Sequence, residues 1–489
     1  MASFYVENFG CRASQADGAA VEEQFRERGF SRADRKNAHV VVLNTCAVTA
    51  SAESDARAAI RRLRRENPEC KVIVTGCYAQ RAPREIAALP GVSLVVGNSH
   101  KHNLAYIALS TNTEKDSIGT KTFIPVTEFT KTSDSPSRDD AVIFVSDIFA
   151  HTELRAAPVF DSANERTRPN LKVQDGCNNR CSFCIIPSLR GRNRSLKMDE
   201  VLRQVNDLVA AGYREVVISG INLGRWGWDL AQAVWGGHPR APRLEDLVSG
   251  ILDHTSIEKL RISSVEPMDW SDSFIRLMAE SSRIAKHAHV PMQSGSDAVL
   301  RRMHRRYRPW HYREKIEKVR AAMPTAAIGA DVMVGFPGET DAEFEETRRM
   351  IEDLPFTYLH VFTFSARPGT PAASMPGVPA RTAHERSQIL RELAANKKLN
   401  FMRSFAGRTL QAITLSRVAQ HSDGNWTEAL SDNYLQLSIA GRYEANQWLN
   451  VQIDSVRDGH LIGHITDAKF DRTNFASIQP QAQSHTYAD

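Results

Sequence analysis

The chain has 489 residues, too many for one ordinary domain, so we expect roughly two to four folded units. Hydrophobic residues make up 42% and charged residues 24%, as in soluble globular proteins. No apolar run approaches the roughly 20 residues of a membrane span, and the start MASFYVENFG lacks a secretory signal, so we expect a cytoplasmic protein with no membrane partner. The net charge of +5 permits nucleic-acid binding but does not establish it.

Residues 1–102 alternate strand and helix signals and predict an open α/β domain with a parallel sheet. The expected strands are 3–10, 39–45 and 71–76, and the expected helices are 15–29 and 53–67. A stretch rich in Ser, Thr, Asp and Lys follows, and we interpret 103–167 as a linker or insertion.

The alternation of strands and helices returns over 168–403. It predicts a partial (β/α)6 TIM-like barrel that is followed by a long helix over 382–403. The expected barrel strands are 171–176, 214–224, 259–267, 286–293, 328–337 and 358–366.

After residue 404 the pattern changes to short strand-like stretches, which predict a small β-barrel over 404–471. The expected strands are 410–418, 426–431, 434–440, 449–456 and 460–466. We interpret 472–489 as an unstructured tail.

Six of the seven cysteines form two groups of three. Cys177, Cys181 and Cys184 lie in DGCNNRCSFCIIP, at a C-x3-C-x2-C spacing directly after the first expected barrel strand. The spacing lacks the paired motif of a structural zinc site, although a structural metal knuckle stays an alternative. A [4Fe–4S] cluster usually takes four thiolates, so three ligands leave one iron open to a cofactor or substrate.

The second group consists of Cys11, Cys46 and Cys77, each at the end of an apolar strand of the first domain. The carboxyl ends of parallel strands share one sheet edge, so these thiols are expected to converge on a second cluster. A buried core thiol is the alternative for each one taken alone. Cys70 precedes the third strand and lies at the opposite edge, so we do not expect it to be a ligand.

The C-x3-C-x2-C motif at the end of a first barrel strand resembles the radical-SAM superfamily. With the second triplet in a preceding α/β domain, nearly the whole chain is similar to the methylthiotransferase family, including a terminal barrel like the RNA-binding TRAM domain. This resemblance implies two [4Fe–4S] clusters and S-adenosylmethionine (SAM). One cluster and SAM then generate the 5′-deoxyadenosyl radical, while the second cluster carries or relays sulfur.

Five further positions are expected to contact the cofactor. Four of them sit at barrel strand ends, where TIM-like enzymes build their sites, and the fifth matches the aromatic position of the radical-SAM motif. For the glycine, a simple turn is an equal interpretation. The positions are Phe183, Gly220, Glu266, Gln293 and Asp331.

Two arginine-rich segments suit contacts with RNA phosphates, RGRNRS (190–195) and RRMHRRYR (301–308). A third run, RRLRR (61–65), is better explained as the solvated face of a helix. The candidate RNA contacts are Arg190, Arg192, Arg194, Arg305 and Arg306.

Within the family, the motifs SGINLG, RISSVEP and LHVFTFSARPGTPA look most like the branch that modifies N6-threonylcarbamoyladenosine beside the anticodon of tRNA. The expected partners are therefore the anticodon arm of tRNA, an electron donor and a sulfur donor. Branches acting on isopentenyladenosine in tRNA or on a ribosomal-protein aspartate remain alternatives. A non-catalytic iron–sulfur RNA-binding protein is the alternative of another class.

Overall fold

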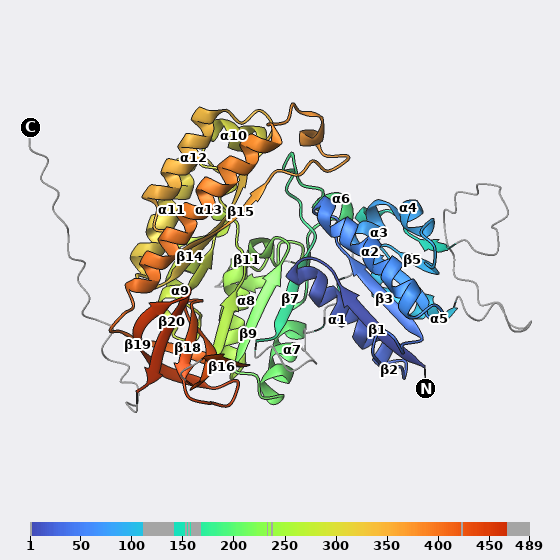
Figure 1. The fold of residues 1–489 in the computed structure, drawn as a ribbon, viewed down its shortest axis with the longest axis horizontal. Coiled ribbons are helices and arrows are strands. Elements are labelled where there is room, and N and C mark those ends of the chain that lie inside the picture. The colour runs from blue at the N-terminus through green and yellow to red at the C-terminus, as the bar shows by residue number, and fades with distance from the viewer. Residues whose placement is uncertain are drawn as a thin grey trace, which may run out of the picture. The chain divides into compact units, whose positions relative to one another are not determined.

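The computed structural model describes residues 2–110, 141–151, 154, 157, 168–231, 233–235, 238–421 and 424–466. The chain divides into two compact units, Met1–Phe401 and Met402–Asp489. The first contains an N-terminal sheet and a β/α barrel, and the second contains the small β-barrel (Figure 1).

The N-terminal layer is a six-stranded parallel sheet in the order β2-β1-β3-β4-β5-β6. Its strands are β1 (Ser3–Asn8), β2 (Ser31–Arg32), β3 (Val40–Thr45), β4 (Lys71–Gly76), β5 (Leu94–Val96) and β6 (Val142–Phe144). Its helices are α1 (Arg12–Arg26), α2 (Ala50–Glu66), α3 (Cys77–Arg81), α4 (Pro83–Ala87) and α5 (Leu104–Ser110).

Helices cover both faces of this sheet, as the continuous apolar strands require. On one face, Phe25 of α1 and Leu104 of α5 pack on Val42 of β3. On the other, Ile60 of α2 packs in a cluster with Leu43 of β3. The three expected strands and two expected helices are therefore confirmed.

The segment 103–167, which we expected to be a linker or insertion, contributes regular structure to the N-terminal domain. It supplies α5 to the layer and β6 to the edge of the sheet, where Val142 pairs with Leu94. Residues 111–140 lie outside the described residues, as does the expected tail 472–489.

The β/α barrel of the first unit contains the six expected strands. They are β7 (Asn170–Asp175), β9 (Glu215–Gly220), β12 (Lys259–Ile262), β13 (His287–His289), β14 (Ala327–Val334) and β15 (Tyr358–Thr363). Parallel pairing links β7, β9 and β12, and links β13, β14 and β15. A parallel bridge between Leu260 and Ile284 joins the two sets.

Helices follow the barrel strands as the βα pattern predicts. They are α6 (Ile186–Arg190), α7 (Met198–Ala210), α8 (Leu244–His254), α9 (Asp272–Glu280), α10 (Asp297–Arg302), α11 (Pro309–Ala322) and α12 (Asp341–Asp353). Two short additions accompany them, the antiparallel strand β8 (Arg194–Ser195) beside β7 and the hairpin of β10 (Ala233–Trp235) and β11 (His238–Arg240).

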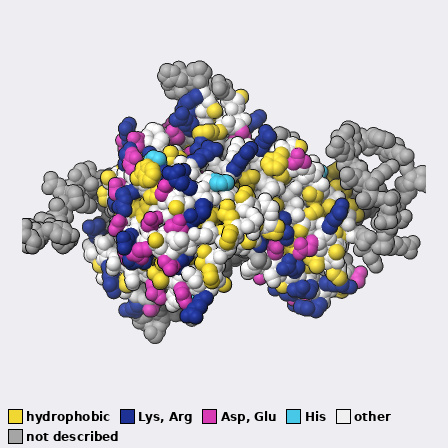
Figure 2. Space-filling view, turned by 90° about the horizontal axis from the view of Figure 1, so that it is seen from above, with side chains coloured by type: hydrophobic (Ala, Val, Ile, Leu, Met, Phe, Trp, Pro, Cys, Tyr) yellow, Lys and Arg dark blue, Asp and Glu magenta, His cyan; other side chains and the backbone are white. Residues whose placement is uncertain are grey.

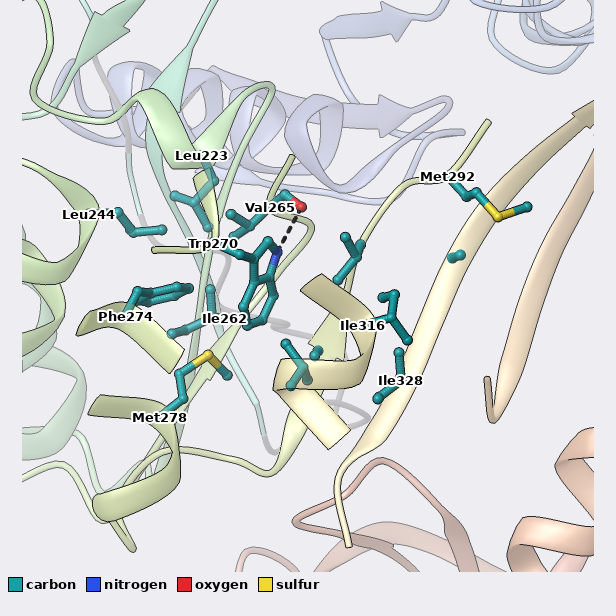
Figure 3. Close-up of a cluster of buried hydrophobic side chains, with 14 of the residues drawn as sticks. Leu223, Leu244, Ile262, Val265, Trp270, Phe274, Met278, Met292, Ile316 and Ile328 are labelled. Atoms are coloured by element: carbon teal, nitrogen blue, oxygen red, sulfur yellow. Dashed lines mark hydrogen bonds between the residues drawn. The ribbon is translucent and has the colours of Figure 1, made fainter. Parts of the chain in front are cut away.

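One apolar core holds the barrel strands against their helices. Trp270 stands at the centre of the cluster in Figure 3, and its indole N–H donates a 3.1 Å hydrogen bond to the carbonyl of Val265. Phe274 and Met278 of α9 pack beside it. This core anchors the strand ends that carry the site residues.

The expected long helix is α13 (Ala380–Arg403). The second unit is a closed five-stranded barrel in the order β16-β17-β18-β20-β19, as expected from the sequence. Its strands are β16 (Thr409–His421), β17 (Gly424–Ser431), β18 (Gln436–Ala440), β19 (Trp448–Arg457) and β20 (His460–Ile465).

Candidate functional site

The first cysteine triplet occupies the loop between β7 and α6. The loop turns at Gly176, whose φ of +73° and approach to the carbonyl of Arg192 leave no room for a side chain. The amide of Cys177 donates to Gly191 O at 3.1 Å, and the amide of Cys184 donates to Cys181 O at 3.1 Å. These bonds fold the C-x3-C-x2-C stretch onto itself and keep its three thiols at the end of the first barrel strand.

Side chains from distant parts of the barrel donate to these sulfurs. The Asn222 Nδ2 lies 3.5 Å from Cys177 Sγ, and an Arg305 guanidinium nitrogen lies 3.3 Å from Cys181 Sγ. Burial raises the pKa of Cys177, and it raises the pKa of Cys184 to about 12. These cysteines therefore become thiolates only when a bound metal and the two donors stabilise the negative charge.

Arg305 belongs to this site and not to an RNA surface. Its side chain is 5% exposed and its guanidinium also pairs with Glu266. The expectation that Arg305 contacts RNA is thus corrected, because a buried guanidinium that is engaged by a thiol and a carboxylate does not reach solvent phosphates. Glu266 in turn orients Arg305.

Of the other expected cofactor positions, Gly220 ends β9 and Gln293 follows β13, whereas Asp331 lies within β14 and not at its end. A Cβ at Gly220 would lie 2.7 Å from Gln174 Oε1, an atom that accepts from the Asn222 amide at 2.7 Å, so close packing requires glycine there. The ring of Phe183 meets Phe336 edge to face with centroids 6.4 Å apart.

Gln293 has the strained backbone expected at a functional position. Its φ is +61°, which a non-glycine residue rarely adopts. Its backbone bonds on both sides to β14, through Asp331 O and the Met333 amide. Its buried Oε1 has no hydrogen-bond partner among the described residues, which leaves an unsatisfied acceptor at this position.

The second triplet lies along the carboxyl edge of the N-terminal sheet, as predicted. Cys11 caps α1 after β1, Cys46 follows β3, and Cys77 opens α3 after β4. Gly10 allows the segment after β1 to lie close to Cys46, since a Cβ at position 10 would lie 2.8 Å from Cys46 Sγ. Burial raises the pKa of Cys46.

Two observations define the edge further. Asn98 Nδ2 lies 3.6 Å from Cys77 Sγ and also donates to Leu189 O of α6 at 2.9 Å. Cys70 immediately precedes β4, at the opposite end of the strand from Cys77, as expected. Asn98 and Asn222 were not singled out by the sequence, although Asn222 lies in the same SGIN segment as Gly220.

A buried ion network joins the two triplets. Arg190 of α6 donates to Asp17 of α1 at 2.9 Å and to Asp175 of β7 at 3.0 Å. Lys172 bridges the same two carboxylates. Against the effect of burial, Arg190 holds the pKa of Asp17 well below its usual value, and Asp17 in turn raises the pKa of Arg190.

This network corrects the expectation for Arg190 and Arg194. They are 2% and 6% exposed, and Arg194 lies 3.6 Å from Asp175, so both are internal and not part of an RNA surface. Arg192 and Arg306 are exposed. On the face seen in Figure 2, Lys and Arg are interspersed with acidic side chains rather than gathered into one field.

Fold and thiol spacing together define a radical-SAM enzyme. A model of the radical SAM superfamily matches residues 171–351, and the model of "uncharacterized protein family UPF0004" matches 3–97. The radical S-adenosylmethionine methyltransferase TsrM from Kitasatospora setae, solved with cobalamin and a [4Fe–4S] cluster, has the same fold at a TM-score of 0.53 and 15% identity, over 76% of this chain and 77% of its own.

Proteins of similar sequence show to which family of radical-SAM enzymes the chain belongs. The threonylcarbamoyladenosine tRNA methylthiotransferase MtaB of Bacillus subtilis is 34% identical over 90% of this chain and 91% of its own length, and MtaB of Aquifex aeolicus is 33% identical over 91% and 99%. The tRNA-2-methylthio-N(6)-dimethylallyladenosine synthase of Acidothermus cellulolyticus is 34% identical over 84% and 77%. The chain belongs to the radical-SAM methylthiotransferase family and is a transferase.

The residues present fit the cofactors of this class, a [4Fe–4S] cluster and SAM. Three thiols on one loop are the soft ligands that iron–sulfur clusters take, and the N–H donors of Asn222 and Arg305 match the negative charge of such a cluster. Among the described residues, no helix has the length and apolarity to cross a membrane.

Proposed function

We propose that the protein is a tRNA methylthiotransferase that converts N6-threonylcarbamoyladenosine, beside the anticodon, to its 2-methylthio derivative. The observation that carries the proposal is the pair of thiol triplets, one in the loop after β7 and one along the carboxyl edge of the N-terminal sheet. Relatives named for this reaction, at 34% and 33% identity over nearly the whole chain, support the substrate.

The chemistry explains why two thiol sites are needed. The C2 carbon of adenine carries a hydrogen and no leaving group, so acid–base catalysis offers no route to a C–S bond. When bound, SAM and a [4Fe–4S] cluster at Cys177, Cys181 and Cys184 supply a carbon radical strong enough to remove that hydrogen. A second cluster at Cys11, Cys46 and Cys77 would supply the sulfur, and a second molecule of SAM would supply its methyl group.

The chain's own residues divide the work. Asn222 and Arg305 would stabilise the thiolates of the first triplet, and Asn98 would stabilise that of Cys77 in the second. The unsatisfied acceptor of Gln293 and the ring of Phe183, which packs against Phe336, would contact the cofactor. The hydrogen bond between Arg190 and Asp17 connects α6 to α1, the helices that follow the two cysteine sites, and so would hold the two sites in a fixed relative position.

The tRNA must present its base out of the stack for the C2 carbon to reach the barrel. Exposed Arg192 and Arg306 remain the candidate phosphate contacts near the first triplet. The closed barrel of the second unit would bind RNA as its TRAM-like pattern implies. An electron donor and a sulfur donor complete the set of partners.

Nucleoside analysis by mass spectrometry of tRNA from cells lacking the gene tests this function. Loss of the methylthio form of threonylcarbamoyladenosine, restored by the wild-type gene, is the expected result. Loss of the methylthio form of dimethylallyladenosine alone would move the protein to the branch of the Acidothermus relative. Unchanged tRNA together with loss of a methylthio-aspartate from a ribosomal protein would move it to the third branch.

A further inference from the structure

The inner face of the last three barrel strands carries two imidazoles and a carboxylate that the proposed mechanism does not use. They belong to His289 of β13, Asp331 of β14 and His360 of β15. Each of the three lies between two residues whose side chains pack in or against the apolar core of the barrel, namely Ala288, Val290, Ala330, Val332, Leu359 and Val361. Because successive side chains of a strand point to opposite faces, the three polar groups point away from the helices and into the barrel.

The three side chains converge. Asp331 and His360 are direct partners in the pairing of β14 with β15. The imidazole rings of His289 and His360 have their centroids 5.6 Å apart. One potential ligand atom from each of the three residues lies within 4.8 Å of the other two.

His289 is oriented as a metal-binding histidine is. Its Nδ1 lies 2.7 Å from Ser264 Oγ, and a hydrogen bond from one ring nitrogen to a neighbour is what fixes the tautomer and direction of a ligating imidazole. Its buried Nε2 has no hydrogen-bond partner among the described residues, although it lies 3.4 Å from Asp331 Oδ1. With the proton on Nδ1, the lone pair of Nε2 and the carboxylate are two electron-rich groups that a cation between them would satisfy.

The spacing of these atoms suits one bound ion. Two ligands about 2.1 Å from a tetrahedral metal ion are roughly 3.4 Å apart, which is the separation of His289 Nε2 from Asp331 Oδ1. His360 is exposed, so a modest rotation of its ring is enough to bring the third ligand to bonding distance. The His289 ring, with its contact to Ser264, would then set the position of the ion.

We propose that His289, Asp331 and His360 hold a divalent transition-metal ion inside the barrel. We name these three residues the His–Asp–His site. The inference goes beyond the proposed function and does not depend on it, because the ion is additional to the iron of the two thiol sites.

The donor set limits the kind of metal. Two imidazoles and one carboxylate suit Zn²⁺, Fe²⁺, Co²⁺ and Mn²⁺, whereas Ca²⁺ and Mg²⁺ prefer oxygen ligands alone. An iron–sulfur cluster is held by thiolates, and this site has none. The single carboxylate with two neutral imidazoles gives a net negative charge, which a divalent cation neutralises.

Three protein ligands leave coordination positions open. Such an arrangement is typical of sites that bind water or an exogenous molecule, whereas structural sites are closed by a fourth side chain. The open positions of the His–Asp–His site would lie on the inner face of the barrel. A metal ion there would therefore bind, and polarise as a Lewis acid, an oxygen atom of the molecule that the barrel holds.

A hydrogen-bond donor of a bound substrate is the other occupant that could satisfy Nε2 and the carboxylate. The two occupants differ in a simple way, because a metal ion binds in the absence of substrate. The test therefore uses the reconstituted holoenzyme without RNA or SAM, with both thiol sites filled and the clusters oxidised. Mn²⁺ is added, and its unbound fraction is measured by electron paramagnetic resonance, in which oxidised [4Fe–4S] clusters are silent. Zn²⁺ is then added as a competitor.

The wild-type protein should bind one Mn²⁺ per chain saturably, and Zn²⁺ should displace it at a lower concentration, as the order of metal affinities requires. Asp331→Asn and His360→Leu should each weaken Mn²⁺ binding by about tenfold or more, since each weakens or removes a ligand. Ser264→Ala should weaken it by roughly 10- to 100-fold through the orientation of His289.

The matched controls are Asp253→Asn on α8 and His384→Leu on α13, both exposed, and both should bind Mn²⁺ as the wild type does. Cluster iron and circular dichroism equal to those of the wild type show that a variant has folded. The absence of a saturable Mn²⁺ site in the wild type would overturn the inference in favour of a substrate donor. Binding that survives in both Asp331→Asn and His360→Leu, or that Zn²⁺ does not displace, would overturn it as well.

Discussion

Arg190, the last residue of the helix behind the barrel's cysteine motif, donates a 2.9 Å hydrogen bond to Asp17 in the first helix of the chain. Asp17 also accepts from Lys101 at 3.1 Å and pairs with Lys172. All four side chains are nearly excluded from solvent. We therefore expect the packing of the N-terminal α/β domain against the β/α barrel to depend on the carboxylate of Asp17.

Asp17→Asn should therefore destabilise the protein by about 3–5 kcal/mol, since it leaves buried cations with one carboxylate fewer. Denaturant unfolding of the cluster-free protein measures the loss. Asp55→Asn, on the exposed face of α2, is the matched control and should stay within about 0.5 kcal/mol of the wild type. An Asp17→Asn protein as stable as this control would contradict the role given to the network.

The two triplets should separate in iron content and in chemistry. Anaerobic reconstitution should give about eight irons per chain, from two four-iron clusters. Replacing Cys177, Cys181 and Cys184 by Ala should remove about half of this iron and abolish SAM cleavage. Undiminished SAM cleavage in that variant would refute the assignment of the first triplet.

Replacing Cys11, Cys46 and Cys77 by Ala should also remove about half of the iron, but leave SAM cleavage in place while methylthiolation is lost. Cys70→Ala should retain all iron, because its thiol lies at the other end of β4. Iron quantification beside a deoxyadenosine assay checks both statements. Loss of a cluster in Cys70→Ala would show that the strand-edge argument is wrong.

Asn222→Ala should lower the reduction potential of the first cluster, because an N–H donor to a cluster sulfur stabilises the more negative reduced state. Potentiometric titration followed by electron paramagnetic resonance measures the change. Asn206→Ala, exposed on α7, is the control. A potential equal to that of the control would mean that the contact with Cys177 has no electronic effect.

Arg305 and Arg306 are neighbours with opposite expected phenotypes. Arg306→Glu should weaken tRNA binding and reduce the slope of log K against log salt by about one, with SAM cleavage intact. Arg305→Met should impair SAM cleavage instead, because its guanidinium contacts Cys181. Arg61→Glu on α2 serves as the surface control, and equal effects of both variants on tRNA binding would contradict the burial of Arg305.

Periodicity and strand-end position were sufficient to predict much of this site. The placement of Cys11, Cys46 and Cys77 followed from the rule that parallel strands end at one edge, and so did the separate position of Cys70. The side chains that serve the thiols were harder to predict. Arg190 resembled a phosphate contact in the sequence because its partner Asp17 lies 173 positions away, and no local pattern reports such a pair.

The edge strand β6 shows a second limit of the sequence. It has three residues, too few to show the two-residue periodicity of a strand. Val142 and Ile143 are both exposed, so buried and exposed side chains do not alternate there. Its parallel pairing with β5, from Val142 beside Leu94 to Phe144 beside Val96, makes the segment a strand. Prediction from sequence thus failed where a long-range partner, and not the local pattern, determines the structure.

The buried network between the layers has a consequence for the order of assembly. Four cations, Lys101, Lys172, Arg190 and Arg194, face two carboxylates, Asp17 and Asp175, beside the second triplet. Any anionic group that binds those thiols relieves this repulsion, so its binding and the closure of the layers are thermodynamically linked. Cluster loading would then act as a maturation checkpoint: a chain with an empty second triplet is less tightly closed, and proteases would distinguish it from the finished enzyme.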